Sequence, residues 1–194
     1  MADRLETRVW PTYDVGPRES VFALGVASVN YARLEFAFGS VFAKVLEVTN
    51  DQAFEELAKT RNNHRCLHRM RDALQKLNWP DDTKDRITHF MEAFKILADN
   101  RNLLDHSAMF AGLEAPTGLY KSDNKGNTIH TAITLVKLRQ VGDDMMRYYN
   151  YGLVLGNSIG PAGEINGPFP KILPGKPPLP KRLSYTSRPL PLTR

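Results

Sequence analysis

The chain is poor in cysteine and in the patterns that bind metals or nucleotides. Cys66 is the only cysteine among 194 residues, which excludes an intramolecular disulfide and any zinc site built on several cysteines. Its five histidines lack the spacing of motifs such as His-Glu-x-x-His, and no glycine-rich phosphate loop occurs. We therefore expect no metal and no other cofactor. Because many secreted domains depend on disulfides, the composition also favours a cytoplasmic setting.

Long apolar runs are missing as well. No stretch approaches the roughly 18 consecutive apolar residues that cross a bilayer. The first residues, Met1 to Glu6, do not combine a basic start with an apolar run, as a signal peptide would. We expect a soluble protein without a membrane partner.

Excess positive charge is confined to the end of the chain. The net charge is +5, but residues 165–194 hold six cations and no acid, which leaves 20 basic and 21 acidic residues in positions 1–164. The same segment holds eight of the 13 prolines, which oppose regular helix and sheet. We therefore predict an N-terminal arm (1–18), a helical domain (19–156) and a basic proline-rich tail (157–194). A near-neutral domain is weak support for nucleic-acid binding by the fold itself.

Apolar residues recur at helical spacings of three and four in most of the domain. The pattern predicts helices over 19–49, over 51–77 with a break near 60–63, from about Asp81 past Leu104, and over 136–155. We expect Ser20 to cap the first helix and Gly156 to end the last one. Alternating β-branched segments around Asp123–Asn127 predict a hairpin before the last helix. The expected fold is mainly all-α: an antiparallel bundle of about four long helices, with a small β-hairpin inserted before the last and a proline-rich C-terminal tail.

The most distinctive segment is Arg101-Asn102-Leu103-Leu104-Asp105-His106. Periodicity carries Arg101 into the core-facing stripe of the third helix, where an unpaired cation is costly. On a helix, Asn102 and His106 share a face, whereas Arg101 lies about 100° from Asn102 and about 140° from His106. Arg101 and His106 can therefore converge only if their side chains reach around the helix, if the helix is distorted, or if a second protomer supplies the partner.

An arginine and a histidine together suit phosphodiester chemistry. A guanidinium group can bind phosphate with two hydrogen bonds and offset developing charge. Histidine can take or give a proton near neutral pH. RNA supplies its own nucleophile, the 2′-hydroxyl, so that such a site requires no metal.

The segment resembles the R-N-x-x-x-H form of the R-x4-6-H motif of HEPN domains, and the helix order over roughly residues 19–156 resembles the layout of these domains. They are small helical bundles, and many are metal-independent endoribonucleases of toxin, antiviral and RNA-processing systems. The resemblance implies catalytic roles for Arg101 and His106 and a phosphate-orienting role for Asn102. It also implies RNA as substrate, a homodimer, and an antitoxin or regulatory protein as a possible partner.

Two other interpretations of the segment stay open. Arg101 and Asp105 are four apart and can form an ordinary intrahelical ion pair. An acid beside the histidine would also repel RNA phosphate, and many members of this family are binding or dimerisation modules.

Glu35, an internal glutamate of the first helix, either pairs with Arg101 and orients it or remains a partly exposed acid.

Further candidates lie outside the motif. A basic group lies in the second helical region. It either binds successive RNA phosphates or forms the solvated face of an amphipathic helix. Its members are Arg61, Arg65, Arg69 and Arg71, with His64 and His68 among them. Cys66 is expected to be a small buried residue. His89 and His130 show no partner pattern.

The tail has two possible roles of its own. It either contacts RNA through its cations or straps across the bundle with apolar residues, which are Phe169, Ile172, Leu173, Leu179, Leu183 and Tyr185. Pro177-Pro178-Leu179-Pro180-Lys181-Arg182 also resembles the P-x-x-P-x-R peptides that SH3 domains bind.

Overall fold

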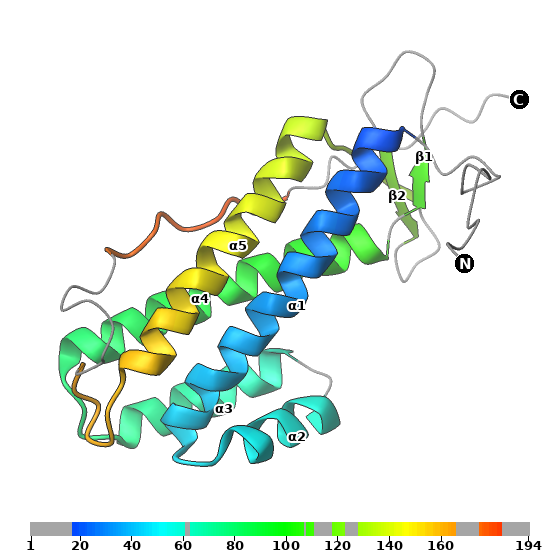
Figure 1. The fold of residues 1–194 in the computed structure, drawn as a ribbon. Coiled ribbons are helices and arrows are strands. Elements are labelled where there is room, and N and C mark those ends of the chain that lie inside the picture. Colours follow the sequence, from blue (N-terminus) through cyan, green and yellow to red (C-terminus); the bar gives the residue numbers. More distant parts are fainter. Residues whose placement is uncertain are drawn as a thin grey trace, which may run out of the picture.

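The computed structural model describes residues 17–60, 63–106, 108–110, 118–122, 128–165 and 175–183. Its architecture is mainly helical, as the periodicity predicts (Figure 1). The helices are α1 (Arg18–Leu46), α2 (Asn50–Thr60), α3 (Asn63–Lys76), α4 (Asp81–Asp105) and α5 (Leu135–Ser158). Between α4 and α5 the backbone forms three antiparallel strands in the order β1 (Ala108–Phe110), β2 (Gly118–Ser122) and β3 (Thr128–Ala132).

The longest helices, α1, α4 and α5, form the body of the bundle, and α2 and α3 lie against one end of it (Figure 1). Small residues allow α1 and α5 to approach closely. A Cβ atom added to Gly142 would lie 3.7 Å from the backbone of Ala27. The side-chain amide of Asn30 uses this proximity to donate a buried hydrogen bond of 3.0 Å to the Gly142 carbonyl. Gly152 faces the ring of Phe90, which leaves no room for a side chain.

Aromatic rings from α1, α4 and α5 fill the core. Phe38, Phe90, Phe94 and Tyr148 are fully buried, and the rings of Phe38 and Phe94 stack with their centroids 4.0 Å apart. These positions belong to the predicted apolar stripes, which the structure confirms. Burial of Cys66 is also confirmed, and burial raises the pKa of its thiol.

Helix ends follow the sequence pattern less closely. The break between α2 and α3 lies where it was predicted. The predicted cap at Ser20 is wrong, because α1 already begins after Pro17 and Ser20 is buried within the first turn. The predicted stop at Gly156 is also wrong. The helix continues to Ser158, and the missing side chain at Gly156 instead permits close contact with Ser40 and Val41 of α1.

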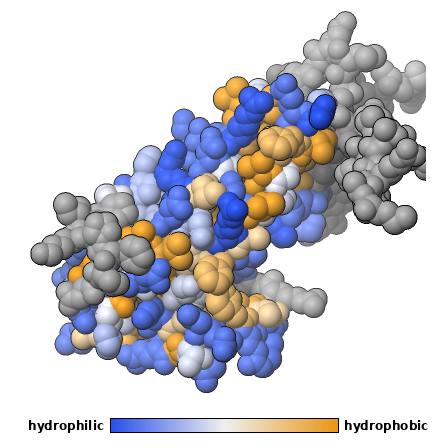
Figure 2. Space-filling model, in the orientation of Figure 1, coloured by the Kyte–Doolittle hydropathy of each residue, from blue (hydrophilic) through white to orange (hydrophobic). Residues whose placement is uncertain are grey.

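One face of α1 leaves apolar side chains uncovered. Phe22, Val26, Val29 and Phe36 are exposed, and we call them the α1 stripe. Figure 2 shows apolar side chains gathered along this helix. Because α1 also buries its opposite face, it is long and apolar enough by composition to cross a membrane. The core helix of a soluble protein passes the same test, so this is weak support for a membrane span.

Residues 175–183 lie along α4 and α5 as an extended segment (red-orange in Figure 1). Of the apolar residues expected to strap the bundle, Leu183 packs against the core, whereas Leu179 is 44% exposed. Pro180 is buried instead. Phe169, Ile172, Leu173 and Tyr185 lie outside the described residues.

Candidate functional site

An open cleft of about 710 Å³ lies between α1, α2, α3 and α4. Aromatic rings, among them the exposed ring of Phe36 and the partly buried ring of Phe54, form part of its wall. Its ionisable side chains are Glu35, His64, Lys95, Asp99 and Arg101, and the amides of Asn63 and Asn102 also line it. The cleft thus combines aromatic rings with cations. Its two carboxylates offset the charges of Lys95 and Arg101, so that its net charge is close to zero.

Arg101 lies at the edge of the core and enters the cleft wall. Its side chain remains 39% exposed at the edge of the core-facing stripe, where it is paired with Asp105. Its exposure comes from the cleft that opens beside it, because Leu104, the next residue of the same stripe, is buried. Its Nε lies 2.6 Å from Oδ2 of Asp105, and its guanidinium carbon lies 5.3 Å from the centre of the Tyr31 ring. An ion pair and a cation–π contact therefore fix the guanidinium group.

Tyr31 provides the aromatic ring that the Arg101 guanidinium group contacts. Its ring is buried and stacks on Phe94, and its hydroxyl accepts a hydrogen bond of 2.9 Å from the amide of Asn63. Burial, and then the charge of Glu35, raise the pKa of Tyr31 well above its ordinary value, so that the ring stays neutral. Tyr31 thereby links α1, α3 and α4 beneath the cleft.

Glu35 lies in the cleft on α1. Among the described residues the direct ion-pair partner of Arg101 is Asp105, not Glu35. Partial desolvation raises the pKa of Glu35, while the charge of Arg101 and a hydrogen bond with Tyr31 oppose this change. The charge of Asp105 raises it further. Arg101 and Tyr31 thus both favour the charged form of Glu35, against the effect of burial.

The structure brings Arg101 and Asn102 together in the cleft but not His106. The Nη1 atom of Arg101 donates to Oδ1 of Asn102 at 3.3 Å. His106 follows the last helical residue, and its backbone N–H donates to the Asn102 carbonyl at 3.2 Å. Its side chain is exposed, and it is not among the residues that line the cleft. Convergence of Arg101 and His106 would require movement of a side chain or a second protomer.

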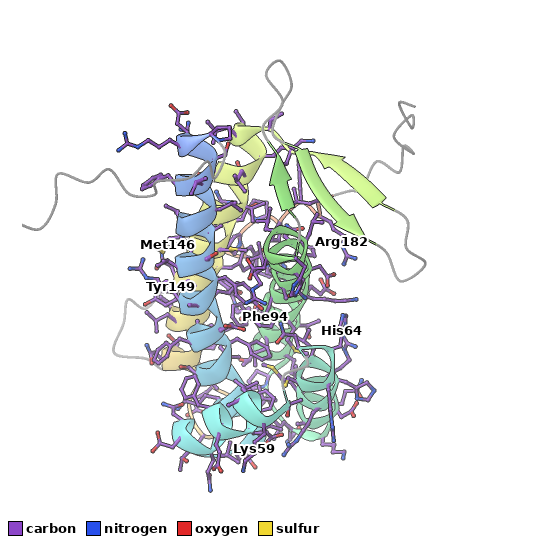
Figure 3. The ribbon with its side chains drawn as sticks, turned by 90° about the vertical axis from the view of Figure 1, so that its right-hand side faces the viewer. Lys59, His64, Phe94, Met146, Tyr149 and Arg182 are labelled. Carbon is purple, nitrogen blue, oxygen red and sulfur yellow. The ribbon has the colours of Figure 1, made fainter. Side chains whose placement is uncertain are left out.

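The histidine that does line the cleft is His64 on α3. Its Nε2 lies 3.9 Å from Oδ1 of Asp99, whose other oxygen lies 3.2 Å from Nη2 of Arg182 in the tail. Figure 3 shows His64 and Arg182 on the same side of the molecule, and Phe94 between α1 and α4. The sequence indicates His64 only as a member of the basic group, because no local pattern connects it with Asp99.

The basic group on α3 is partly neutralised by nearby acids. Arg69 pairs with Glu56 of α2, and His68 pairs with Asp72 at 2.9 Å. Arg65 and Arg71 are exposed, and Arg61 lies outside the described residues. The opposite face of α3 buries Cys66, Leu67, Met70 and Leu74. This distribution favours the solvated face of an amphipathic helix over a continuous phosphate-binding stripe.

Within the described ranges, no three His, Cys, Asp or Glu side chains come together as metal ligands would. Comparison of the chain with protein-family models, with curated proteins and with solved structures gives no significant match. The geometry of the cleft and of the motif beside it is therefore the basis for assigning a function.

Proposed function

We propose that the protein is a metal-independent endoribonuclease of the HEPN type, working in a toxin or defence system of the cytoplasm. The main observation behind the proposal is that part of the motif lines the same cleft as other cations and an aromatic ring. Arg101 and Asn102, the first two residues of the motif, line it together with His64, Lys95 and the ring of Phe36. Cations can bind the phosphates of single-stranded RNA there, while aromatic rings stack on its bases.

In the proposed reaction the 2′-hydroxyl of RNA attacks the adjacent phosphorus. A histidine takes the hydroxyl proton, the bond to the 5′-oxygen breaks, and this oxygen leaves with a proton. The products are a 2′,3′-cyclic phosphate and a 5′-hydroxyl. Arg101 offsets the charge that develops on the phosphate, Asn102 orients it, and Asp105 holds Arg101 in place.

The motif assigns the role of proton acceptor to His106, whereas the histidine that lines the cleft is His64. Purified protein should cleave single-stranded RNA in the presence of EDTA and leave cyclic phosphate ends. His106→Ala should abolish cleavage with helicity by circular dichroism unchanged. Loss in His64→Ala together with full activity in His106→Ala would move the role to His64. Strict dependence on a divalent metal, or cleavage of DNA, would refute the mechanism.

A specific observation favours a second candidate, a non-catalytic HEPN-like module that binds RNA or protein or dimerises. The ion pair of 2.6 Å between Arg101 and Asp105 occupies one edge of the guanidinium group. In such a module the pair would be structural, and RNA would bind in the cleft without being cut. Binding without cleavage in the EDTA assay would favour this candidate.

The proposed assembly is a homodimer, with RNA as substrate, an antitoxin or regulatory protein as a possible further partner, and no membrane partner. Phe22, Val29 and Phe36 of the α1 stripe follow one another at the spacing of a heptad, which suits helix pairing. Phe36 also lines the cleft, so a second copy on the stripe would lie beside the site. The proposed fold keeps a small hairpin before α5 and a proline-rich tail after it.

Substitution on the stripe tests this assembly. Val29→Glu should yield a monomer in sedimentation velocity, because it places a charge in the apolar contact. Ser28→Glu, an equal change of charge at the neighbouring exposed position, should leave the dimer intact. A monomeric wild-type protein that cleaves RNA would show that the site is complete within one chain.

A further inference from the structure

Side chains of α4 and α5 form hydrogen bonds with the backbone of the tail segment 175–183. The Pro177 carbonyl accepts hydrogen bonds from the Tyr148 hydroxyl at 2.9 Å and from Nε2 of His89 at 2.8 Å. Nε2 of His89 also lies 2.9 Å from the Tyr148 hydroxyl, so the two side chains and the carbonyl form one hydrogen-bonded cluster. Further along, the amide of Asn100 donates to the Lys181 carbonyl at 3.0 Å and accepts from the Leu183 N–H at 2.8 Å.

Charges at the two ends of the segment match acids on α4. Lys176 pairs with Asp85, and Arg182 pairs with Asp99 at 3.2 Å. Between these pairs Pro180 is buried, while Pro178 and Leu179 are exposed. Along the segment, the surface of α4 and α5 thus contacts a basic residue, a proline-containing stretch and a second basic residue in that order.

This is the chemistry by which proteins recognise polyproline II segments. Such segments form no internal hydrogen bonds, so their carbonyls are available to donors such as tyrosine, histidine and asparagine. Proline has no backbone N–H, so docking leaves no donor unsatisfied at Pro177, Pro178 and Pro180. Their fixed φ angles also reduce the conformational entropy lost on binding.

We propose that α4 and α5 form a recognition groove for basic polyproline segments, and that residues 175–183 are its resident ligand. The segment is a docked peptide, separable from the folded bundle, because most of its contacts are hydrogen bonds and exposed ion pairs and little of it is buried. Docking also turns Pro180 and Arg182, two positions of the P-x-x-P-x-R pattern, toward the chain's own helices.

The test uses the full chain with a protease site placed in the sequence between Ile165 and Gly175. The chain is folded intact and cut afterwards, and a fluorescent peptide of residues 175–183 is added. The peptide should exchange into the cut protein and raise fluorescence anisotropy. It should not enter the uncut protein, because the tethered segment acts at a local concentration on the order of millimolar.

Matched variants separate recognition from general attraction. Arg182→Gln in the peptide should weaken binding about two- to fivefold, as expected for an exposed ion pair. Lys181→Gln removes the same charge from a side chain without a described contact and should change affinity less than about twofold. Tyr148→Phe in the bundle should weaken binding roughly three- to tenfold by removing a donor, whereas Tyr149→Phe should have no effect.

Several results would overturn the proposal. Unfolding of the bundle on cleavage would show that the segment is part of the core. A folded, cut protein that loses its tail and fails to bind the peptide would show that the groove does not recognise it. Equal losses for Arg182→Gln and Lys181→Gln would show that only overall charge matters.

Discussion

The middle and the end of α4 meet their neighbours in different ways. In the middle, Phe90 and Phe94 are buried among rings of α1 and α5. Near the end, Asp99 pairs with His64, and Arg101 pairs with Asp105. Asn100 between them donates a hydrogen bond to the tail. Burial of a large apolar side chain is worth several times an exposed ion pair. The middle of α4 therefore stabilises the fold through buried rings, while the exposed ion pairs of Asp99 and Arg101 near its end contribute less.

The largest expected effect comes from the middle. Phe90→Ala should lower the free energy of unfolding by about 3–5 kcal/mol, because it removes a fully buried ring and leaves a cavity. Glu92→Ala, on the exposed side of the same turn, should change it by less than about 0.5 kcal/mol. Denaturant unfolding measures both. Similar small losses would mean that the aromatic core is not the source of stability.

Asn100 should give an intermediate effect. Asn100→Ala removes two hydrogen bonds to the tail from a buried side chain and should cost about 1–3 kcal/mol. Asn102→Ala, the same change at an exposed position two residues later, should cost less than about 0.5 kcal/mol. Thermal unfolding of the full chain distinguishes them. Equal melting temperatures would show that the tail adds nothing to stability.

The ion pair at the motif should contribute less. Arg101 and Asp105 are 39% and 31% exposed, so Arg101→Gln and Asp105→Asn should each cost at most about 1 kcal/mol. Arg101→Gln should cost slightly more, because it also removes the cation–π contact with Tyr31. A loss of several kcal/mol in either variant would assign the pair to the core of the fold.

The smallest effect concerns pH. The pKa of Glu35 is raised in the folded state above its ordinary value of 4.5, so folding favours its protonated form. This contribution is present below pH 4.5 and is lost as pH rises through the folded pKa. Glu35→Gln should therefore match wild type near pH 4 and be slightly more stable at pH 7. A less stable variant at pH 7 would show that Glu35 forms a stabilising pair with Arg101.

The sequence predicts the middle of α4 better than its end, for a physical reason. Phe90, Phe94 and Leu97 follow a helical period that reports burial directly. The same period assigns Arg101 and Leu104 to the core-facing stripe, but only Leu104 is buried, because periodicity does not show where a cleft opens beside a helix. The partners of His64 and His89 are Asp99 and the Pro177 carbonyl, which lie far along the chain, and no local pattern connects them.

The central claim is that Arg101 binds the phosphate of RNA and is not only the partner of Asp105. The most direct test compares RNA cleavage in EDTA by wild type, Arg101→Gln and Asp105→Asn at equal folded concentrations. If Arg101 acts on phosphate, Arg101→Gln should abolish cleavage, and Asp105→Asn should spare or raise it by removing an acid that repels RNA. Equal loss of cleavage in both variants, or full activity in Arg101→Gln, would contradict the claim.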